Sequence, residues 1–377
     1  MKRILFVINS LPGGGAEKVL YDILRKIDKQ KYNIEIFLIN NEGIYIDKIK
    51  NLGVKIDYLF PKRKDKVNFV LYRKIKSCIL LIKKFLYLRF PRLVYKLKHK
   101  RYDIEIAFLE GNPTLFLGNR KTTALKIAWV HNDLEKHRVL SKKNEKKAYS
   151  KMNKIICVSN DSKKSVENLY PELQENIEVI YNPIPKEEIL SKSLEIENIY
   201  SKKKINIVTV GRLNVQKGYD VLLKAHKELL KEGLDYNLYI LGEGEERKKL
   251  EKYIKENNIE KNTFLLGFKE NPYPYIKQAN IFISSSRYEG YSLVVAEALC
   301  LEKPVIATKC VGPIELLNNG KYGLLAEVEN IDSLKEKMKK LILDEELRIK
   351  YSELSRERAK IFDIEKTMKE IERLLDE

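Results

Sequence analysis

Two glutamates stand eight positions apart in the stretch RYEGYSLVVAEAL, residues 287–299. Glu289 falls in a polar turn, whereas Glu297 falls within an otherwise apolar segment. The segment 293–300 predicts a helix, with Ser292 as its N-cap. Because helical side chains lean toward the N-terminus, we expect Glu297 to point back toward Glu289. An ionised side chain is costly among apolar neighbours, so the pair indicates a binding site, although a purely local capping role for Glu297 is the alternative.

The start of this predicted helix is also suited to bind an anion. Backbone amides from Tyr291 to Val295 are free there, at the positive end of the helix dipole. Amides beside carboxylates fit a sugar nucleotide, because the amides bind phosphate while the carboxylates accept hydrogen bonds from ribose and hexose hydroxyls.

A second group of charges follows a predicted strand in GRLNVQKG, residues 211–218. Arg212 and Lys217 lie five positions apart beyond the end of this strand. A guanidinium and an ammonium in that position could clamp a diphosphate from two directions. The alternative is that both are solvated surface charges.

The first half of the chain offers weaker candidates. Gly14 and Gly15, in SLPGGGAEKVL, allow close approach of the backbone to a ligand, or simply form a tight turn. The neutral imidazole of His131, at a strand end in WVHND, could hydrogen-bond a sugar hydroxyl or be structural. Glu110 and Asp133 also follow strand ends and could meet an acceptor hydroxyl.

Short β-branched runs alternate with helical patterns along the chain, which predicts parallel sheets covered by helices on both faces. The expected strands are 4–8, 34–39, 54–59, 103–109, 125–131, 154–159, 177–181, 205–211, 238–242, 263–267, 281–286 and 304–308. The fold class is therefore α/β, with two doubly wound Rossmann-like domains and a ligand cleft between them. The predicted parts are a first domain 1–182, a linker 183–204, a second domain 205–360, and an amphipathic helix 361–377 that could cross back to the first domain.

Composition narrows the class of protein. The chain has 377 residues, 44% hydrophobic and 33% charged, as expected for a globular protein of two domains. Its four cysteines lack CxxC spacing, which argues against a disulfide or zinc framework and favours a reducing cytosol. We find no uninterrupted apolar run of about 18 residues. The run Ile4–Ile8 is too short for a signal peptide.

The positive charge is concentrated in one segment. The net charge is +19, and residues 62–101 contain fifteen Lys/Arg and one Asp. A helical projection of this segment predicts an apolar face of Leu71, Ile75, Cys78, Ile79, Ile82 and Leu86 opposite a basic face of Arg73, Lys76, Lys83 and Lys84. This pattern is typical of a helix in an anionic membrane interface, the alternative being a core-packing helix with a solvated basic face. No module for binding nucleic acid is recognisable.

Several motifs together resemble a known family. They are GRLNVQKG, LGEGEE, GF at 267–268, SSSRYEGYSLVVAEALCLEKPVIAT, NGKYGLL and, near the N-terminus, VINSLPGGGAEKVL. The chain thereby resembles the retaining glycosyltransferases of family 4 (glycosyl transferases group 1), which have the GT-B fold. Glu289 and Glu297 match that family's E-x7-E motif, and the likeness extends over nearly the whole chain.

The resemblance implies a role for each candidate. Arg212 and Lys217 would neutralise the donor diphosphate, Glu289 would contact the transferred sugar, and His131 would contact the sugar near its reacting face. Glu297 would hold the ribose. The remaining donor-binding positions are Gly14 and Gly15 beside the phosphates, Gly242, Glu243 and Phe268 around the base, and Gly290, Tyr291, Ser292 and Leu293 in the turn.

The resemblance also implies a mechanism: front-face attack with retention of configuration, in which the leaving diphosphate helps to deprotonate the acceptor. The sequence has no D-x-D, so we expect neither a metal nor another cofactor, with Arg212 and Lys217 in place of the cation. One departure from the family is KCVGPIELL at 309–317, where many members have a Gly-Gly turn. The sugar-facing loop is therefore expected to differ.

The resulting hypothesis is a bacterial enzyme that transfers a hexose or N-acetylhexosamine from a nucleotide sugar, with UDP favoured, to a lipid-linked or growing glycan. It would act in surface polysaccharide synthesis as a peripheral protein on the cytoplasmic face of the cell membrane, bound through residues 62–101. Two alternatives stay open. One is a UDP-sugar epimerase of the same architecture, and the other is a non-catalytic polyanion-binding protein.

Overall fold

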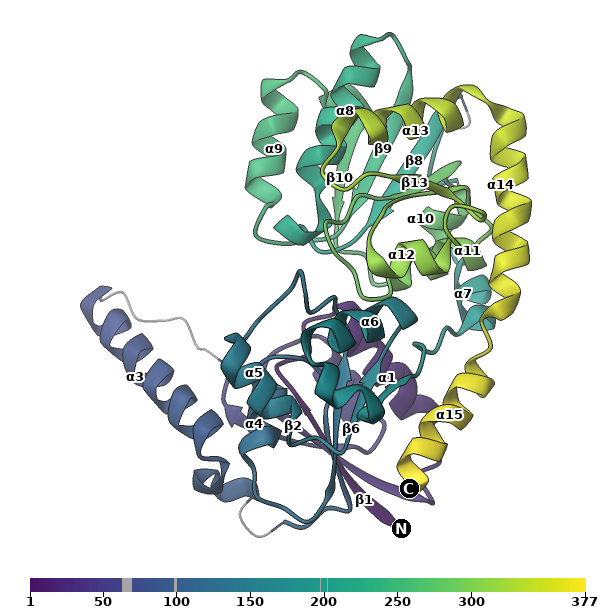
Figure 1. Ribbon diagram of the computed structural model, residues 1–377. Coiled ribbons are helices and arrows are strands. Elements are labelled where there is room, and N and C mark those ends of the chain that lie inside the picture. The colour runs from purple at the N-terminus through teal and green to yellow at the C-terminus, as the bar shows by residue number, and fades with distance from the viewer. Residues whose placement is uncertain (63–69, 98–99, 197, 202) are drawn as a thin grey trace. The chain divides into compact units, whose positions relative to one another are not determined.

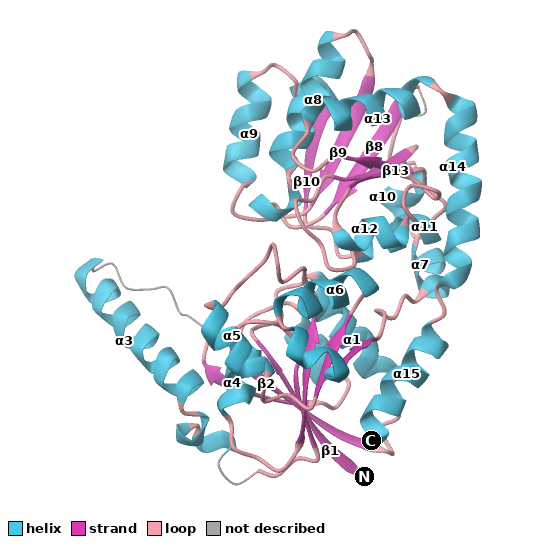
Figure 2. Cartoon of the chain, viewed as in Figure 1, coloured by secondary structure: helices cyan, strands magenta, loops and turns pink. Residues whose placement is uncertain are grey.

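The computed structural model describes residues 1–62, 70–97, 100–196, 198–201 and 203–377; the side chains of residues 70–77 and 95 lie outside the described part. The chain forms two compact units (Figure 1). Unit 1 comprises Met1–Tyr181 together with Thr367–Glu377, and unit 2 comprises Asn182–Lys366. Each unit has helices packed around its own parallel sheet (Figure 2).

The sheet of unit 1 has seven parallel strands within the described residues, in the order β3-β2-β1-β4-β5-β6-β7. The strands are β1 (Lys2–Ile8), β2 (Tyr32–Asn40), β3 (Lys55–Phe60), β4 (Ile104–Ala107), β5 (Leu125–Val130), β6 (Lys154–Cys157) and β7 (Ile177–Val179). The helices are α1 (Gly15–Lys26), α2 (Tyr45–Lys50), α3 (Val70–Arg89), α4 (Asn112–Asn119), α5 (Lys142–Tyr149), α6 (Asn160–Leu169) and the C-terminal α15 (Ile364–Asp376), with 3-10 turns η1 (Pro91–Leu93), η2 (Tyr95–Leu97) and η3 (Pro171–Asn176).

Unit 2 has a six-stranded parallel sheet in the order β10-β9-β8-β11-β12-β13, again counted over the described residues. Its strands are β8 (Ile205–Val210), β9 (Tyr236–Leu241), β10 (Thr263–Gly267), β11 (Ile281–Ser284), β12 (Val305–Thr308) and β13 (Leu324–Ala326). Its helices are α7 (Lys186–Lys192), α8 (Tyr219–Lys231), α9 (Arg247–Glu256), α10 (Tyr273–Gln278), α11 (Leu293–Cys300), α12 (Val311–Leu316), α13 (Ile331–Leu343) and α14 (Glu345–Arg358), with 3-10 turns η4 (Val215–Lys217), η5 (Glu260–Asn262) and η6 (Ala359–Ile361).

Both sheets have the strand order of a doubly wound Rossmann-like fold, which confirms the predicted fold class. All of the predicted strands form. The additional strand β13 is the edge strand of the second sheet, only half-buried at Leu324 and Leu325, and it pairs with β12.

The ends of unit 2 differ from the predicted boundaries. The predicted linker 183–204 contains α7, which packs on α10 and α11, so this segment is part of unit 2. The C-terminal residues 367–377 belong to unit 1. There the hydroxyl of Tyr32 donates to Asp376 at 2.6 Å and Lys2 donates to the carbonyl of Leu375 at 3.1 Å.

Within the described residues, every helix is too short or too polar to cross a bilayer. The same residues contain no cluster of His, Cys, Asp and Glu side chains that could hold a metal ion. All four cysteines are free thiols.

Candidate active site

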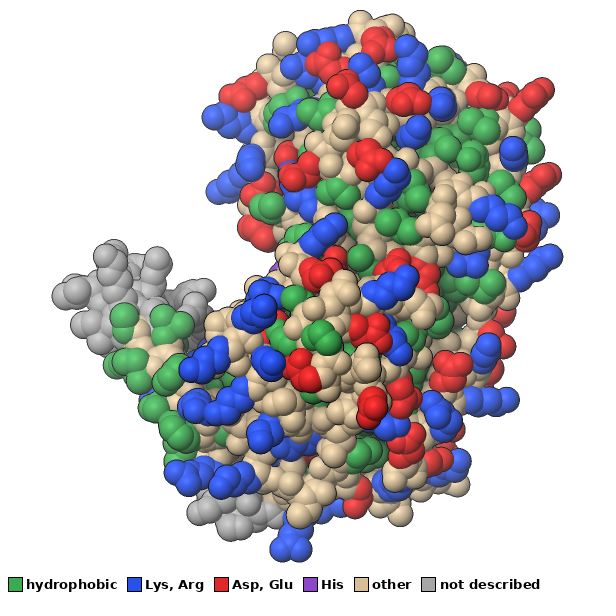
Figure 3. Space-filling view, viewed as in Figure 1, with side chains coloured by type: hydrophobic (Ala, Val, Ile, Leu, Met, Phe, Trp, Pro, Cys, Tyr) green, Lys and Arg blue, Asp and Glu red, His purple; other side chains and the backbone are tan. Residues whose placement is uncertain are grey.

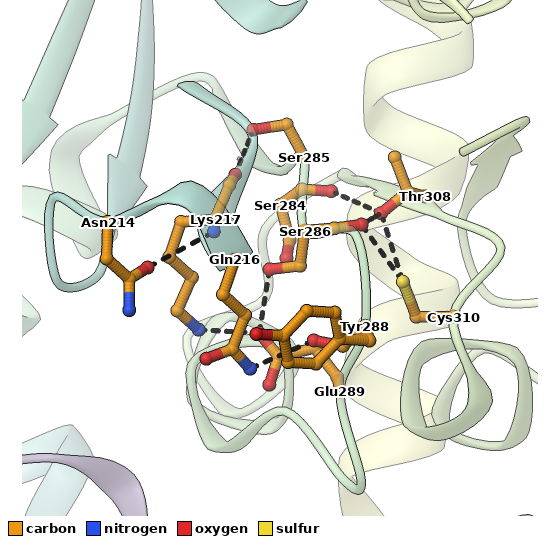
Figure 4. A network of polar contacts seen from close by, with 10 residues as sticks. All are labelled: Asn214, Gln216, Lys217, Ser284, Ser285, Ser286, Tyr288, Glu289, Thr308 and Cys310. Carbon is orange, nitrogen blue, oxygen red and sulfur yellow. Dashed lines mark hydrogen bonds and ion pairs between the residues drawn. The ribbon is translucent and has the colours of Figure 1, made fainter. Parts of the chain in front are cut away.

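An ion pair in unit 2 joins two of the predicted residues. Lys217 ends η4, after β8, and its Nζ lies 2.5 Å from Oε1 of Glu289, which follows β11 (Figure 4). Ser286 donates to the same oxygen at 2.7 Å. Glu289 is 8% exposed, so its charge depends on these donors rather than on water. The structure thus brings a cation and a carboxylate from two neighbouring strand ends into contact.

Arg212 is placed differently from Lys217. It is exposed, and its side chain makes no hydrogen bond or ion pair with any residue of the described part of unit 2. Its backbone belongs to the same loop, because the next amide, of Leu213, donates to the carbonyl of Glu243 at 2.9 Å. Arg212 is therefore a cation available to a ligand at this edge of the sheet.

Helix α11 begins at Leu293, as predicted, but Ser292 does not cap it in the predicted way. The side chain of Ser292 makes no capping hydrogen bond, and its backbone is left-handed with φ of 70°. Its hydroxyl is buried and finds no partner among the described residues. A left-handed serine with an unsatisfied buried hydroxyl is unfavourable, and such strain is concentrated at functional sites.

Glu297 lies in the middle of α11 and is 4% exposed. The hydroxyl of Tyr273, at the start of α10, donates to its Oε1 at 3.3 Å. This tyrosine gives the carboxylate a polar neighbour within an apolar helix. No local sequence pattern indicates this contact.

Glycines allow the strand ends of unit 2 to approach closely. Gly242, after β9, has φ of 144°, and a Cβ there would lie 1.9 Å from the carbonyl oxygen of Gly211, after β8. Only glycine fits this position. Beside it, Glu243 pairs with Arg247 at 2.5 Å, and the side chain of Phe268 is 52% exposed.

The segment KCVGPIELL contacts the turn that carries Glu289. A Cβ on Gly312 would lie 2.4 Å from the backbone of Tyr291. The thiol of Cys310 donates to the carbonyl of Ser286 at 2.9 Å, and Thr308 donates to the same carbonyl at 2.5 Å. Gly290 and Tyr291 are both buried in this turn. The part of the chain that departs from the family pattern is therefore packed against the predicted donor site.

His131 belongs to unit 1 and follows β5. Its ring centroid lies 4.8 Å from that of Phe108 and 6.4 Å from that of Trp129. Burial lowers the pKa of His131 to about 3, so the imidazole is neutral. Its Nε2 is buried and has no hydrogen-bond partner within the described residues. A neutral imidazole with a free nitrogen is the state expected for binding a hydroxyl.

Other predicted residues of unit 1 have structural partners. Glu110 accepts the backbone N–H of His131 at 3.1 Å and the side-chain amide of Asn132. Asp133 accepts the hydroxyl of Ser165 at 2.8 Å and the amide of Glu135 at 3.0 Å. Both carboxylates therefore hold the loop of His131.

The glycine loop leads into α1, which begins at Gly15, with Gly14 at its N-cap position. A Cβ on Gly14 would lie 2.4 Å from the carboxylate of Glu17. An acidic side chain is thus already close to the amides at the start of this helix.

Sequence reasoning missed the serines that hold the site. Ser286 binds Glu289, and Ser285 donates to the carbonyl of Lys217 at 2.8 Å. Both belong to the run SSS before RYEG, at the end of a predicted strand. Their position at a strand end is the sequence feature that could have marked these serines as site residues.

Known proteins match both units. Residues 192–358 match the family Glycosyl transferases group 1, and residues 13–188 match Glycosyltransferase Family 4. A Campylobacter jejuni protein, N-acetylgalactosamine-N,N'-diacetylbacillosaminyl-diphospho-undecaprenol 4-alpha-N-acetylgalactosaminyltransferase, is 31% identical over 378 residues, which cover 96% of each chain. The amylovoran biosynthesis glycosyltransferase AmsD of Erwinia amylovora is 23% identical and covers 94% of this chain and 93% of its own.

Solved structures share the fold at lower identity. Anabaena HepE, in complex with UDP and glucose, has a TM-score of 0.75 and 18% identity, and the match covers 100% of both chains. Sucrose-phosphate synthase of Thermosynechococcus elongatus has a TM-score of 0.78 and 14% identity, over 100% of this chain and 98% of that one. With both halves matched and a relative above 30% identity over 96% of the chain, the chain belongs to glycosyltransferase family 4 and has the GT-B fold.

Proposed function

We propose that the protein transfers a hexose or N-acetylhexosamine from a UDP-sugar to a lipid-linked or growing glycan, with retention of the anomeric configuration. The observation that carries the proposal is the contact between Lys217 and Glu289 beside the strained, unsatisfied Ser292. This arrangement combines groups for a phosphate with a group for sugar hydroxyls.

On the donor side, the diphosphate lies at the start of α11. The hydroxyl of Ser292 and the amides of the first turn donate to its oxygens, and the strain at Ser292 is offset by the bound ligand. Lys217 and Arg212 compensate the charge that develops on the leaving diphosphate. These two cations take the place of a metal ion. Glu289 accepts a hydroxyl of the transferred sugar, and Glu297 accepts the ribose hydroxyls.

On the acceptor side, the attacking hydroxyl approaches from the face that the diphosphate leaves. An oxygen of the leaving diphosphate takes the proton of that hydroxyl. His131 is neutral and makes one hydrogen bond with the sugar, as donor or acceptor. Because its pKa is lowered to about 3, it does not compete for the proton of the attacking hydroxyl.

The nature of the acceptor is inferred from two relatives. One is named for an undecaprenol diphosphate acceptor, and the other for the synthesis of a polysaccharide. A lipid-linked acceptor lies in a membrane, and we propose that the enzyme works at the cytoplasmic face of that membrane. The surface of unit 1 supports this location.

Helix α3 presents apolar side chains to solvent. The exposed fraction is 48% for Ile79, 66% for Leu81, 60% for Ile82 and 67% for Phe85. In Figure 1 α3 leans away from the rest of unit 1, which it meets near its C-terminal end, where Leu88 enters the core. Of the predicted faces, the side chains of Leu71, Ile75, Arg73 and Lys76 lie outside the described part. An exposed apolar row of this kind is typical of a docking surface.

Helix α5 adds charge to the same side of unit 1. Both α3 and α5 pack on α4. Lysines 142, 143, 146 and 147 of α5 are all exposed, and Figure 3 shows Lys and Arg side chains beside the green side chains of α3. We propose that α3 inserts its apolar row into the interface of an anionic membrane while α5 attracts the phosphate head groups.

A thermal-shift panel of UDP, GDP and ADP and their sugars tests the donor. UDP at 100 times its Kd is expected to stabilise unit 2 by about 2.7 kcal/mol. Transfer to a polyprenyl-diphosphate glycan, followed by NMR of the product, is expected to retain the anomeric configuration. Failure of all three nucleotides to bind would reject the donor site. Conversion of the UDP-sugar to its epimer without an acceptor would instead identify an epimerase.

A further inference from the structure

Arg287 joins the two loops that carry Lys217 and Glu289. Its Nη1 donates to the carbonyl of Val215 at 2.6 Å and to Oδ1 of Asp220 at 3.0 Å, and its Nη2 donates to Oδ2 of Asp220 at 2.9 Å. Val215 begins η4, and Asp220 lies in the first turn of α8, so these contacts lie on either side of Lys217 in the chain.

A second carboxylate, that of Glu329, completes the shell of Arg287. Its Nε donates to Oε1 of Glu329, in the loop before α13, at 2.8 Å. Four of the five N–H donors of the guanidinium are therefore used. Burial acts to raise the pKa of Asp220, but the hydrogen bonds and charge of Arg287 outweigh it and hold that pKa below its usual value. The carboxylate thus stays ionised beside the guanidinium.

The backbones of the two loops are also joined at this point. The amide of Arg287 donates to the carbonyl of Gln216 at 2.7 Å, and the side chain of Gln216 donates to the carbonyl of Tyr288 at 3.0 Å (Figure 4). Gly218 has φ of +63°, and a Cβ there would lie 2.2 Å from the carbonyl oxygen of Ser285. The loops therefore touch directly, and Lys217 lies between the contacts made by Arg287.

Direct binding of phosphate by Arg287 is the competing explanation. Its side chain is only 19% exposed, and both of its Nη atoms are already bonded to Asp220. An incoming phosphate would have to displace a bidentate carboxylate, the strongest arrangement that a guanidinium forms with a single acid. The geometry therefore favours a role in holding the loops.

We propose that Arg287 is a positioning residue of the donor site: with Asp220 and the carbonyl of Val215 it fixes the loop 215–220 so that Lys217 stays on Glu289. This inference rests on the proposed function, in which Lys217 binds the donor diphosphate. Misplacement by about 1 Å of a group that orients a substrate can cost as much as 100-fold in rate. The single-point ammonium of lysine cannot replace the fork of Arg287.

The test compares Arg287→Lys with Arg356→Lys in the full chain. Arg356 makes a similar fork with Glu302, at 2.9 and 3.3 Å, between α14 and the turn after α11. Arg287→Lys is expected to lower kcat/KM for the donor and to weaken UDP binding by about tenfold. Arg356→Lys is expected to leave both unchanged. If Arg287→Lys fails to fold, Asp220→Asn removes the same fork from the other side.

A double variant separates positioning from general stability. If Arg287 acts through Lys217, Arg287→Lys is expected to leave the UDP Kd of a Lys217→Ala protein unchanged. An equal loss of UDP affinity in the wild-type and Lys217→Ala backgrounds would overturn the proposal, as would wild-type kcat/KM in the Arg287→Lys protein. Absence of UDP binding by the wild-type protein is a separate result, because it would overturn the donor site itself.

Discussion

The donor loops of unit 2 and helix α3 of unit 1 differ in how their side chains are satisfied. Glu289 accepts hydrogen bonds from Lys217 and Ser286, and Arg287 donates to Asp220 and Val215 across the loops. In α3 the side chains of Leu81 and Phe85 are each about two-thirds exposed. Polar groups that are hydrogen-bonded to one another fix the position of a ligand of defined shape. An exposed apolar row instead suits a partner surface that has no defined shape, such as a membrane.

This difference agrees with the two partners that we propose. A nucleotide sugar needs donors and acceptors at fixed distances, and its proposed site is made from hydrogen-bonded loops at strand ends. A membrane needs only an apolar face with positive charge nearby. Substitutions in the loops of unit 2 should therefore affect catalysis, whereas substitutions in α3 should affect membrane binding.

The largest effect is expected for Lys217→Ala. Removal of a donor that stabilises the leaving group costs roughly 3 kcal/mol, so kcat should fall by more than 100-fold. The matched control is Lys231→Ala, which removes an exposed lysine of α8 that pairs with Glu228 and should leave kcat unchanged. Steady-state kinetics measure both. Near-normal turnover of Lys217→Ala would show that Lys217 does not stabilise the leaving diphosphate.

A smaller effect is expected for Leu81→Ser, on membrane binding. Burying a leucine is worth about 1.5 kcal/mol or more, so its loss should weaken partition into phosphatidylglycerol vesicles by about tenfold. Leu343→Ser is the control, because Leu343 has the same exposed fraction of 66% but lies in unit 2. Co-sedimentation measures the binding. Equal losses for the two variants would show that α3 has no special role.

Ser292→Gly should separate stability from binding within unit 2. Glycine accepts the left-handed backbone and removes the unsatisfied hydroxyl, so the free energy of unfolding should rise by about 1 kcal/mol. UDP should bind about fivefold more weakly, because a hydrogen bond to phosphate is lost. Thermal denaturation and calorimetry measure the two quantities. A stabilised protein with unchanged UDP affinity would show that the strain at Ser292 is unrelated to the ligand.

A further prediction concerns the pH dependence of stability in unit 1, which leaves the donor loops and α3 unaffected. The folded pKa of His131, about 3, is below the value of 6.5 expected in the unfolded chain. The stability from this neutral imidazole is therefore fully present above about pH 6.5 and is lost as the pH falls toward 3. His131→Asn should reduce the slope of unfolding free energy against pH on the acid side of about pH 6.5. An unchanged slope would mean that folding does not lower the pKa of His131.

Much of the fold could be predicted because its signals are local. Runs such as Ile4–Ile8 and Ile281–Ser284 alternate with helical patterns, and those patterns alone indicate parallel sheets. Strand β13 was not predicted; it lies at the edge of its sheet and is defined by its pairing with β12. Helix α7 falls in a segment that predicts a linker, because its short polar sequence is stabilised by packing on α10 and α11.

The sequence by itself determined the residue types of the candidate site and their spacing, including Glu289, Glu297 and Lys217, because motif and periodicity are properties of the chain. Only the tertiary structure decided that Lys217 touches Glu289, that Ser292 is strained rather than a side-chain cap, and that Arg287 ties the loops together. The Lys217–Glu289 and Arg287–Asp220 contacts join residues about 70 positions apart. Their geometry is set by the register of neighbouring strands and by the turns after them, which no local pattern encodes.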